Sequence, residues 1–114
     1  MKLLNDELAA KFECHPFCSC GDNLFDEEVV AKFFNPLGKA YWFILEAEKM
    51  EDDYLMFGYC ELGLGPDCSE WGYVSLKELE SLVLPFGLGI ECDLNVKGTV
   101  RDNLEALGIE YYEW

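Results

Sequence analysis

Residues 14–20 read Cys-His-Pro-Phe-Cys-Ser-Cys, so three of the six cysteines and the only histidine fall within one short segment. Thiolate and imidazole groups are ligands that zinc prefers, and a structural zinc ion takes four of them in a tetrahedron. Cys14, Cys18 and Cys20 can supply three ligands, because Ser19 leaves the chain room to turn two thiolates toward one centre. The sequence therefore predicts a structural Zn²⁺ site at this segment.

The fourth zinc ligand has to come from elsewhere. Cys68 is the preferred candidate because it lies in a loop with glycine and proline neighbours. His15, Cys60 and Cys92 are the alternatives, but the last two fall in predicted strands, where a cysteine is most often a small buried hydrophobe. We assign these two to the core. The spacing C-x3-C-x-C differs from the usual pairs of C-x2-C, so reduced unpaired thiols and an oxidative disulfide stay open.

The same residues do not predict catalysis. A catalytic cysteine needs a lowered pKa and a base, and His15 stands beside Cys14, where backbone geometry disfavours a productive pair. A zinc ion with four protein ligands leaves no position for a reacting water. With 23 acidic residues, some carboxylates lie close by chance, and no pair can be assigned as general acid and base. We expect no enzyme, and a zinc- or thiol-dependent hydrolase is the alternative.

The net charge indicates the kind of partner. The 23 acidic and 8 basic residues give a formal net charge of −15, which repels nucleic acid and anionic membranes and attracts basic protein surfaces. Spaced carboxylates can imitate phosphates and dock on the Lys and Arg residues of a DNA-binding channel. We therefore expect a monomer with a basic protein partner and no direct binding of nucleic acid or membrane. The candidate partner-binding residues form two acidic blocks, Asp22, Asp26, Glu27 and Glu28, and then Glu46, Glu48, Glu51, Asp52 and Asp53.

The elements that position these residues follow from the apolar pattern. The expected strands are residues 29–34, 40–46, 54–61, 70–74 and 90–96, and the expected helices are residues 6–11, 76–84 and 100–107. Residues 13–26 and 48–53 are expected loops, and the tail 109–114 is expected to pack back as a strand. Together they predict a single α+β domain, residues 1–114, with an antiparallel meander of four to five strands, two or three short helices and a cysteine-rich N-terminal loop.

Local signals support these elements. Asn5, Ser75 and Thr99 are expected N-caps. Residues 41–45 are apolar at every position, so we expect both faces of that strand to be covered. The second helix should bury a stripe formed by Leu76, Leu79, Leu82 and Val83. Because no apolar leader and no run of about 18 apolar residues occurs, we expect a cytoplasmic protein whose thiols stay reduced.

Four segments carry a resemblance to a known family. They are AKFFNP (residues 31–36), FGY (57–59), WGYVSLKELE (71–80) and PFGLGIECDL (85–94). With them, the chain resembles a family of small uncharacterised domains carried on plasmids, phages and other mobile elements. In that family a short polar linker usually replaces residues 14–20 and an arginine usually replaces Cys92. The resemblance implies the fold and a host bacterial cytosol, and it makes the cysteine cluster an addition to the family scaffold.

By size, charge and setting, the chain also resembles the anti-CRISPR proteins. That resemblance implies an acidic inhibitor that binds a basic nucleic-acid-binding region of a CRISPR effector nuclease and blocks DNA loading. A generic protein-interaction module of a mobile-element operon is the other alternative, for which Tyr111, Tyr112 and Trp114 are a candidate apolar patch.

Overall fold

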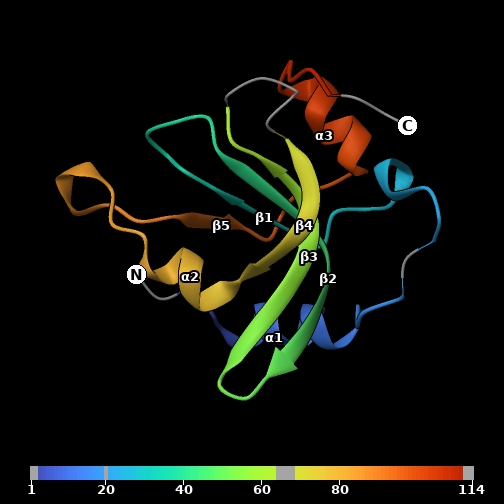
Figure 1. Ribbon diagram of the computed structural model, residues 1–114, viewed down its shortest axis with the longest axis horizontal. Coiled ribbons are helices and arrows are strands. Elements are labelled where there is room, and N and C mark those ends of the chain that lie inside the picture. The colour runs from blue at the N-terminus through green and yellow to red at the C-terminus, as the bar shows by residue number, and fades with distance from the viewer. Residues whose placement is uncertain (1–2, 20, 64–68, 112–114) are drawn as a thin grey trace.

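The computed structural model describes residues 3–19, 21–63 and 69–111 (Figure 1). Within them, five antiparallel strands form one sheet in the order β4-β3-β2-β1-β5. In chain order the elements are α1 (Asp6–Glu13), η1 (Leu24–Asp26), β1 (Ala31–Phe34), β2 (Tyr41–Met50), β3 (Asp53–Glu61), β4 (Glu70–Ser75), α2 (Leu76–Ser81), η3 (Pro85–Gly87), β5 (Glu91–Asp93) and α3 (Val100–Ala106). The predicted α+β class and the antiparallel meander are confirmed.

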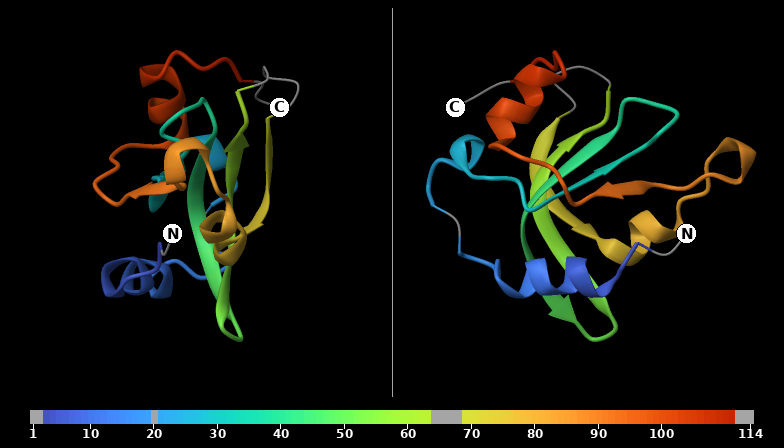
Figure 2. Two further views of the ribbon diagram at one scale, coloured as in Figure 1. Left: turned by 90° about the vertical axis from the view of Figure 1, so that its left-hand side faces the viewer. Right: turned by 180° about the vertical axis from the view of Figure 1, so that it is seen from behind.

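The strand β2 lies at the centre of the sheet and carries core residues on both faces. Successive side chains of a strand point to opposite faces. Trp42 and Ile44 belong to a first cluster with α1 and α2, while Phe43 and Leu45 belong to a second cluster with η1 and α3. Figure 2 shows α1 near the turn of the long β2–β3 hairpin and α3 toward its other end. The prediction that both faces are covered is confirmed.

The helices begin where the sequence predicts. Oδ1 of Asn5 accepts a hydrogen bond from the Leu8 N–H across 2.8 Å. The hydroxyl of Ser75 caps α2, and Thr99 opens α3 with a reciprocal capping box. Each cap satisfies a backbone N–H that has no partner within its own helix. Among the described residues, none of the helices has the length and apolar character that a membrane span requires.

The predicted hairpin loop 48–53 is wrong in its extent. β2 continues to Met50 and β3 begins at Asp53, so the turn consists of Glu51 and Asp52. Glu51 takes a positive φ of 58°, which lets two residues reverse the chain. The register of β2 also shifts between Ile44 and Glu46 at a bulge. The second acidic block is therefore mostly strand.

Three other expectations of element length also fail. α2 ends at Ser81, whose hydroxyl donates to the Glu78 carbonyl, so Leu82 and Val83 leave the expected buried stripe and are 43% and 86% exposed. β5 ends at Asp93, whose carboxylate accepts the N–H of the turn that follows. Residues 109–111 of the expected tail strand are in irregular backbone, and residues 112–114 lie outside the described residues.

Candidate functional site

The described part of the cysteine-rich loop begins at the C-terminal end of α1. Cys14 caps that helix, and its N–H donates to the Lys11 carbonyl across 3.2 Å. Cys18 takes a positive φ of 68°, and both thiols are exposed. Cys20 and Cys68, the other predicted zinc ligands, lie outside the described residues. The zinc site stays a prediction, for which Cys14 and Cys18 are the described half of the donor set.

The alternative ligands His15, Cys60 and Cys92 have different surroundings. His15 is exposed beside Cys14, and among the described residues no group of three or more His, Cys, Asp or Glu side chains is placed to hold a metal. Cys60 and Cys92 are half-buried against the first core cluster. Burial is the main cause that raises the pKa of each thiol to about 11. Both thiols are protonated at neutral pH and belong to the core, as expected.

Two acidic side chains hold the cysteine-rich loop in place. The Phe17 N–H donates to Oε1 of Glu48 across 3.1 Å, and the Gly21 N–H donates to Oε1 of Glu27 across 2.6 Å. A Cβ at Gly21 would lie 2.8 Å from that oxygen, so only glycine fits without displacing the carboxylate. The Phe17 ring also packs edge-on against Tyr73 of β4. These carboxylates, predicted to bind a partner, order the loop.

Asp53 joins the β2–β3 turn to the start of α2. It accepts hydrogen bonds from the Ser75 hydroxyl, from the Lys77 N–H across 3.0 Å and from the Tyr54 N–H across 2.7 Å. Burial alone would raise the pKa of Asp53, but these three hydrogen bonds hold it below its usual range. Beside it, Asp52 forms an ion pair with Lys77, whose hydrogen bond lowers the pKa of Asp52. Both carboxylates thus have partners within the fold.

Two further members of the predicted acidic blocks are engaged or buried. Oδ1 of Asp26 pairs with Nε of Arg101 across 3.0 Å, which ties η1 to α3. Glu46 is only 7% exposed because it lies within β2 just after the bulge. The expectation that Glu46 faces a partner needs correction, since a buried carboxylate in a central strand cannot reach one.

The exposed negative charge is spread more widely than the two blocks. Of the predicted set, five are exposed, and two of these, Asp26 and Asp52, are held in ion pairs: Asp22, Asp26, Glu28, Glu51 and Asp52. Exposed acids outside it occur on helices, on strands and in the chain that follows α3: Asp6, Glu7, Glu13, Glu70, Glu78, Glu91, Asp102, Glu105 and Glu110. The exposed negative charge is therefore distributed over many elements rather than confined to the two predicted blocks.

A small cavity with acidic walls lies between the cysteine-rich loop and η1. It has a volume of about 250 Å³. The Ala47 N–H donates to the His15 carbonyl across 3.0 Å, which fixes the backbone at one wall. A Lys or Arg side chain of a partner fits a concave surface of this charge. Its lining residues are His15, Ser19, Asp26, Glu27, Glu28 and Leu45.

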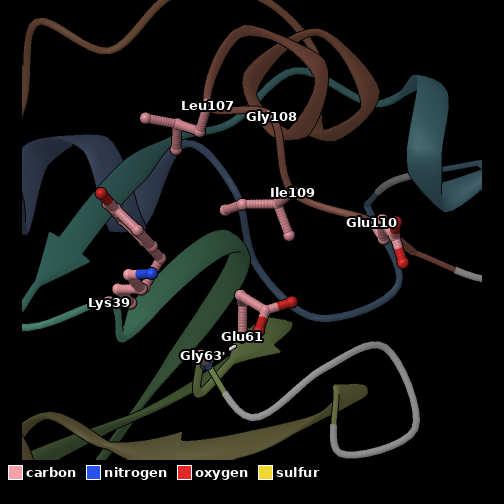
Figure 3. A pocket seen from close by; sticks show the side chains of 8 residues that line it. Lys39, Glu61, Gly63, Leu107, Gly108, Ile109 and Glu110 are labelled. Atoms are coloured by element: carbon pink, nitrogen blue, oxygen red, sulfur yellow. Dashed lines mark hydrogen bonds between the residues drawn. The ribbon is translucent and has the colours of Figure 1, made fainter.

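A larger cavity, of about 450 Å³, was not predicted. It lies between the β1–β2 turn, the end of β3 and the chain after α3, and Figure 3 shows Lys39, Glu61 and Ile109 around it. Glu61 is 3% exposed and accepts hydrogen bonds from the Gly63 N–H across 2.8 Å and from the Ser69 hydroxyl across 2.5 Å. These bonds tie the end of β3 to the chain before β4. No local motif joins Glu61 to Ser69, so the sequence offers no signal for this cluster.

Fold and charge together define a small, acidic α+β domain built on one antiparallel sheet. The chain belongs to the family described as "Protein of unknown function (DUF2958)", whose model matches residues 3–103. No curated protein and no solved structure matches the chain. The family match covers every described helix and strand from α1 to β5 and most of α3, so the cysteine-rich loop lies within the family domain.

Proposed function

We propose that this chain is a non-enzymatic inhibitor of anti-CRISPR type from a mobile element, which binds a basic nucleic-acid-binding region of a CRISPR effector nuclease and blocks DNA loading. The observation that carries the proposal is the net charge of −15 on a chain of 114 residues. Such a charge raises the rate at which the protein meets a basic surface and disfavours nucleic acid as a direct ligand.

Exposed carboxylates on several elements suit this role better than a single patch would. They give a field that acts before contact, and the channel of a nuclease presents many Lys and Arg residues over a long path. Asp22 and Glu28 flank η1 in the sequence, and Glu28 lines the acidic cavity together with His15. We place the first contacts there, with a partner Lys or Arg entering the cavity.

The predicted zinc ion has a supporting role in this proposal. The exposed thiols of Cys14 and Cys18, together with Cys20 and Cys68, would hold it, and it would brace the loop that forms one wall of the acidic cavity. The hydrogen bonds from Phe17 and Gly21 already fix part of this loop. The ion thus stabilises the interface and takes part in no reaction.

The test measures how a panel of purified, guide-loaded CRISPR effector nucleases binds target DNA. Fluorescence polarisation of labelled DNA reports this loading with and without an excess of the chain. We expect loading to fall for the sensitive nuclease and inhibition to weaken as salt rises. A variant with Asp22→Asn, Glu28→Gln and Glu51→Gln should inhibit less than a control with Glu70→Gln, Glu105→Gln and Glu110→Gln, which has the same net charge. Undiminished loading by every nuclease would overturn the proposal.

A further inference from the structure

Residues 82–88, which we call the apolar loop, expose most of their side chains to solvent. Phe86 is 92% exposed and Val83 is 86% exposed, with Leu82 and Leu88 at 43% and 38%. Figures 1 and 2 show this segment extending away from the sheet, beyond α2 and β5. A single exposed leucine is ordinary, but four apolar side chains in one projecting loop form a patch of the kind that marks an interaction site.

Hydrogen bonds within the apolar loop fix its shape. The Leu84 N–H donates to the Leu88 carbonyl across 2.9 Å, and the Leu88 N–H donates to the Pro85 carbonyl across 3.4 Å. Pro85 restricts its own φ, which reduces the loop's freedom further. A loop held in one conformation loses little entropy on binding. The apolar tip is therefore preorganised for contact.

The backbone at Phe86 is strained, and the fold itself does not need the ring. Phe86 has a φ of 64° and a ψ of 22°, a left-handed conformation that is an outlier for a bulky residue. Glycine or asparagine adopts it at lower cost. A ring that is almost fully exposed contributes little to packing in return. Both the strain and the exposure are accounted for if Phe86 contacts another molecule.

Charge decides which kind of molecule fits. Residues 82–89 contain no charged side chain, while Glu78 and Glu91 on either side are exposed. A second copy of the chain would bring another net charge of −15, and an anionic membrane would also repel this rim. The complementary surface is an apolar pocket bordered by Lys and Arg side chains on another protein.

We infer that the apolar loop anchors this chain to its partner protein, with Phe86 and Val83 entering an apolar pocket bordered by basic residues. The inference rests on the proposed function in taking that partner to be the basic nuclease. A specific interface buries about 800 Å² on each side, more than one short loop supplies. The acidic surface around the loop therefore forms the rim, while the buried aromatic ring supplies most of the affinity.

The test compares binding kinetics of the wild-type chain, Phe86→Ala and the control Leu37→Ala on the immobilised guide-loaded nuclease that the wild type inhibits. Leu37 is 49% exposed in the β1–β2 turn, so the control removes a similar apolar side chain elsewhere. We expect Phe86→Ala to weaken binding about thirtyfold or more through faster dissociation, with association and salt dependence unchanged. Val83→Ser should act in the same direction. Equal dissociation rates for Phe86→Ala and Leu37→Ala would overturn the inference.

A second arm separates this inference from the proposed function. This arm applies if the wild type binds none of the nucleases. A photo-crosslinking amino acid is then placed at position 86, or at position 37 as the control, and each chain is crosslinked to proteins of the bacterial cytosol. A protein captured only at position 86 is then purified, and a thirtyfold loss of its affinity on Phe86→Ala supports the loop as anchor. Equal capture at both positions would overturn the inference. Dimers detected by sedimentation and abolished by Phe86→Ala would also overturn it, because the loop would then contact a second copy of the chain.

Discussion

The carboxylate of Glu48 accepts a hydrogen bond from the backbone N–H of Phe17 across 3.1 Å and so joins the cysteine-rich loop to β2. A carboxylate that charge alone assigns to a partner thus has a structural partner 31 residues away in the sequence. This hydrogen bond and the one from the Gly21 N–H to Glu27 order part of the cysteine-rich loop. From the sequence alone, we expect zinc to order that loop.

Replacing Glu48 should loosen this loop without disturbing the sheet. For Glu48→Ala we expect the free energy of unfolding to fall by about 1 kcal/mol, because the Phe17 N–H loses its acceptor. Amide hydrogen exchange should rise at Phe17 and stay unchanged along β3. Asp22→Ala, which removes an exposed carboxylate, is the control and should alter neither quantity. Unchanged exchange at Phe17 in Glu48→Ala would show that the loop is held by something else.

Asp53 should make the stability of the domain depend on pH. Hydrogen bonds lower the pKa of Asp53 in the folded state, so its ionised carboxylate stabilises the fold fully above the unfolded pKa of about 3.9. This stabilisation is lost as the pH falls through the lower pKa of the folded state. At neutral pH, Asp53→Ala should lower the free energy of unfolding by about 1–3 kcal/mol. Urea titrations at neutral and strongly acidic pH measure this difference, which should shrink in acid.

The matched variant is Asp52→Asn. Asp52 pairs with Lys77 at the surface, where the two side chains are 81% and 52% exposed, so Asp52→Asn should lower the free energy of unfolding less than Asp53→Ala does. Equal losses for the two variants, or a deficit in Asp53→Ala that persists in strong acid, would contradict the role given to Asp53.

Features that depend on neighbouring residues, such as helix caps, can be predicted from the sequence. The roles of side chains that contact residues far away in the sequence cannot. Asn5, Ser75 and Thr99 cap helices with donors only a few residues away, so their roles follow from spacing. The covered faces of β2 follow from its unbroken apolar run. By contrast, Glu46 and Glu48 look like surface charge until the bulge and the loop place them. Net charge cannot separate a carboxylate that faces a partner from one that accepts a backbone N–H.

The cysteines should divide into two classes of reactivity. Burial raises the pKa of Cys60 and Cys92 to about 11, so their thiols should react slowly with iodoacetamide at neutral pH. Cys14 and Cys18 are exposed and should react fast once any bound metal is removed. Mass spectrometry of peptides labelled with and without a chelator measures each site.

The same labelling tests the zinc prediction. If zinc is bound, the chelator should speed the labelling of Cys14 and Cys18, leave Cys60 and Cys92 unchanged and lower the midpoint of thermal unfolding. Elemental analysis of the purified protein should find about one zinc per chain, and less in Cys14→Ser. Protein purified without metal, with chelator-independent labelling, would contradict the zinc site.

Relieving the strain at Phe86 should stabilise the domain. The left-handed backbone of a bulky residue costs about 1–2 kcal/mol, whereas glycine pays about 0.5–1 kcal/mol for its greater freedom in the unfolded chain. Phe86→Gly should therefore raise the free energy of unfolding by up to about 1.5 kcal/mol, measured by urea titration. Phe86→Ala keeps its Cβ and should change stability little, because the lost ring is 92% exposed. A destabilised Phe86→Gly, or a Phe86→Ala as unstable as a core truncation, would show that the ring supports the fold and is not held there for a partner.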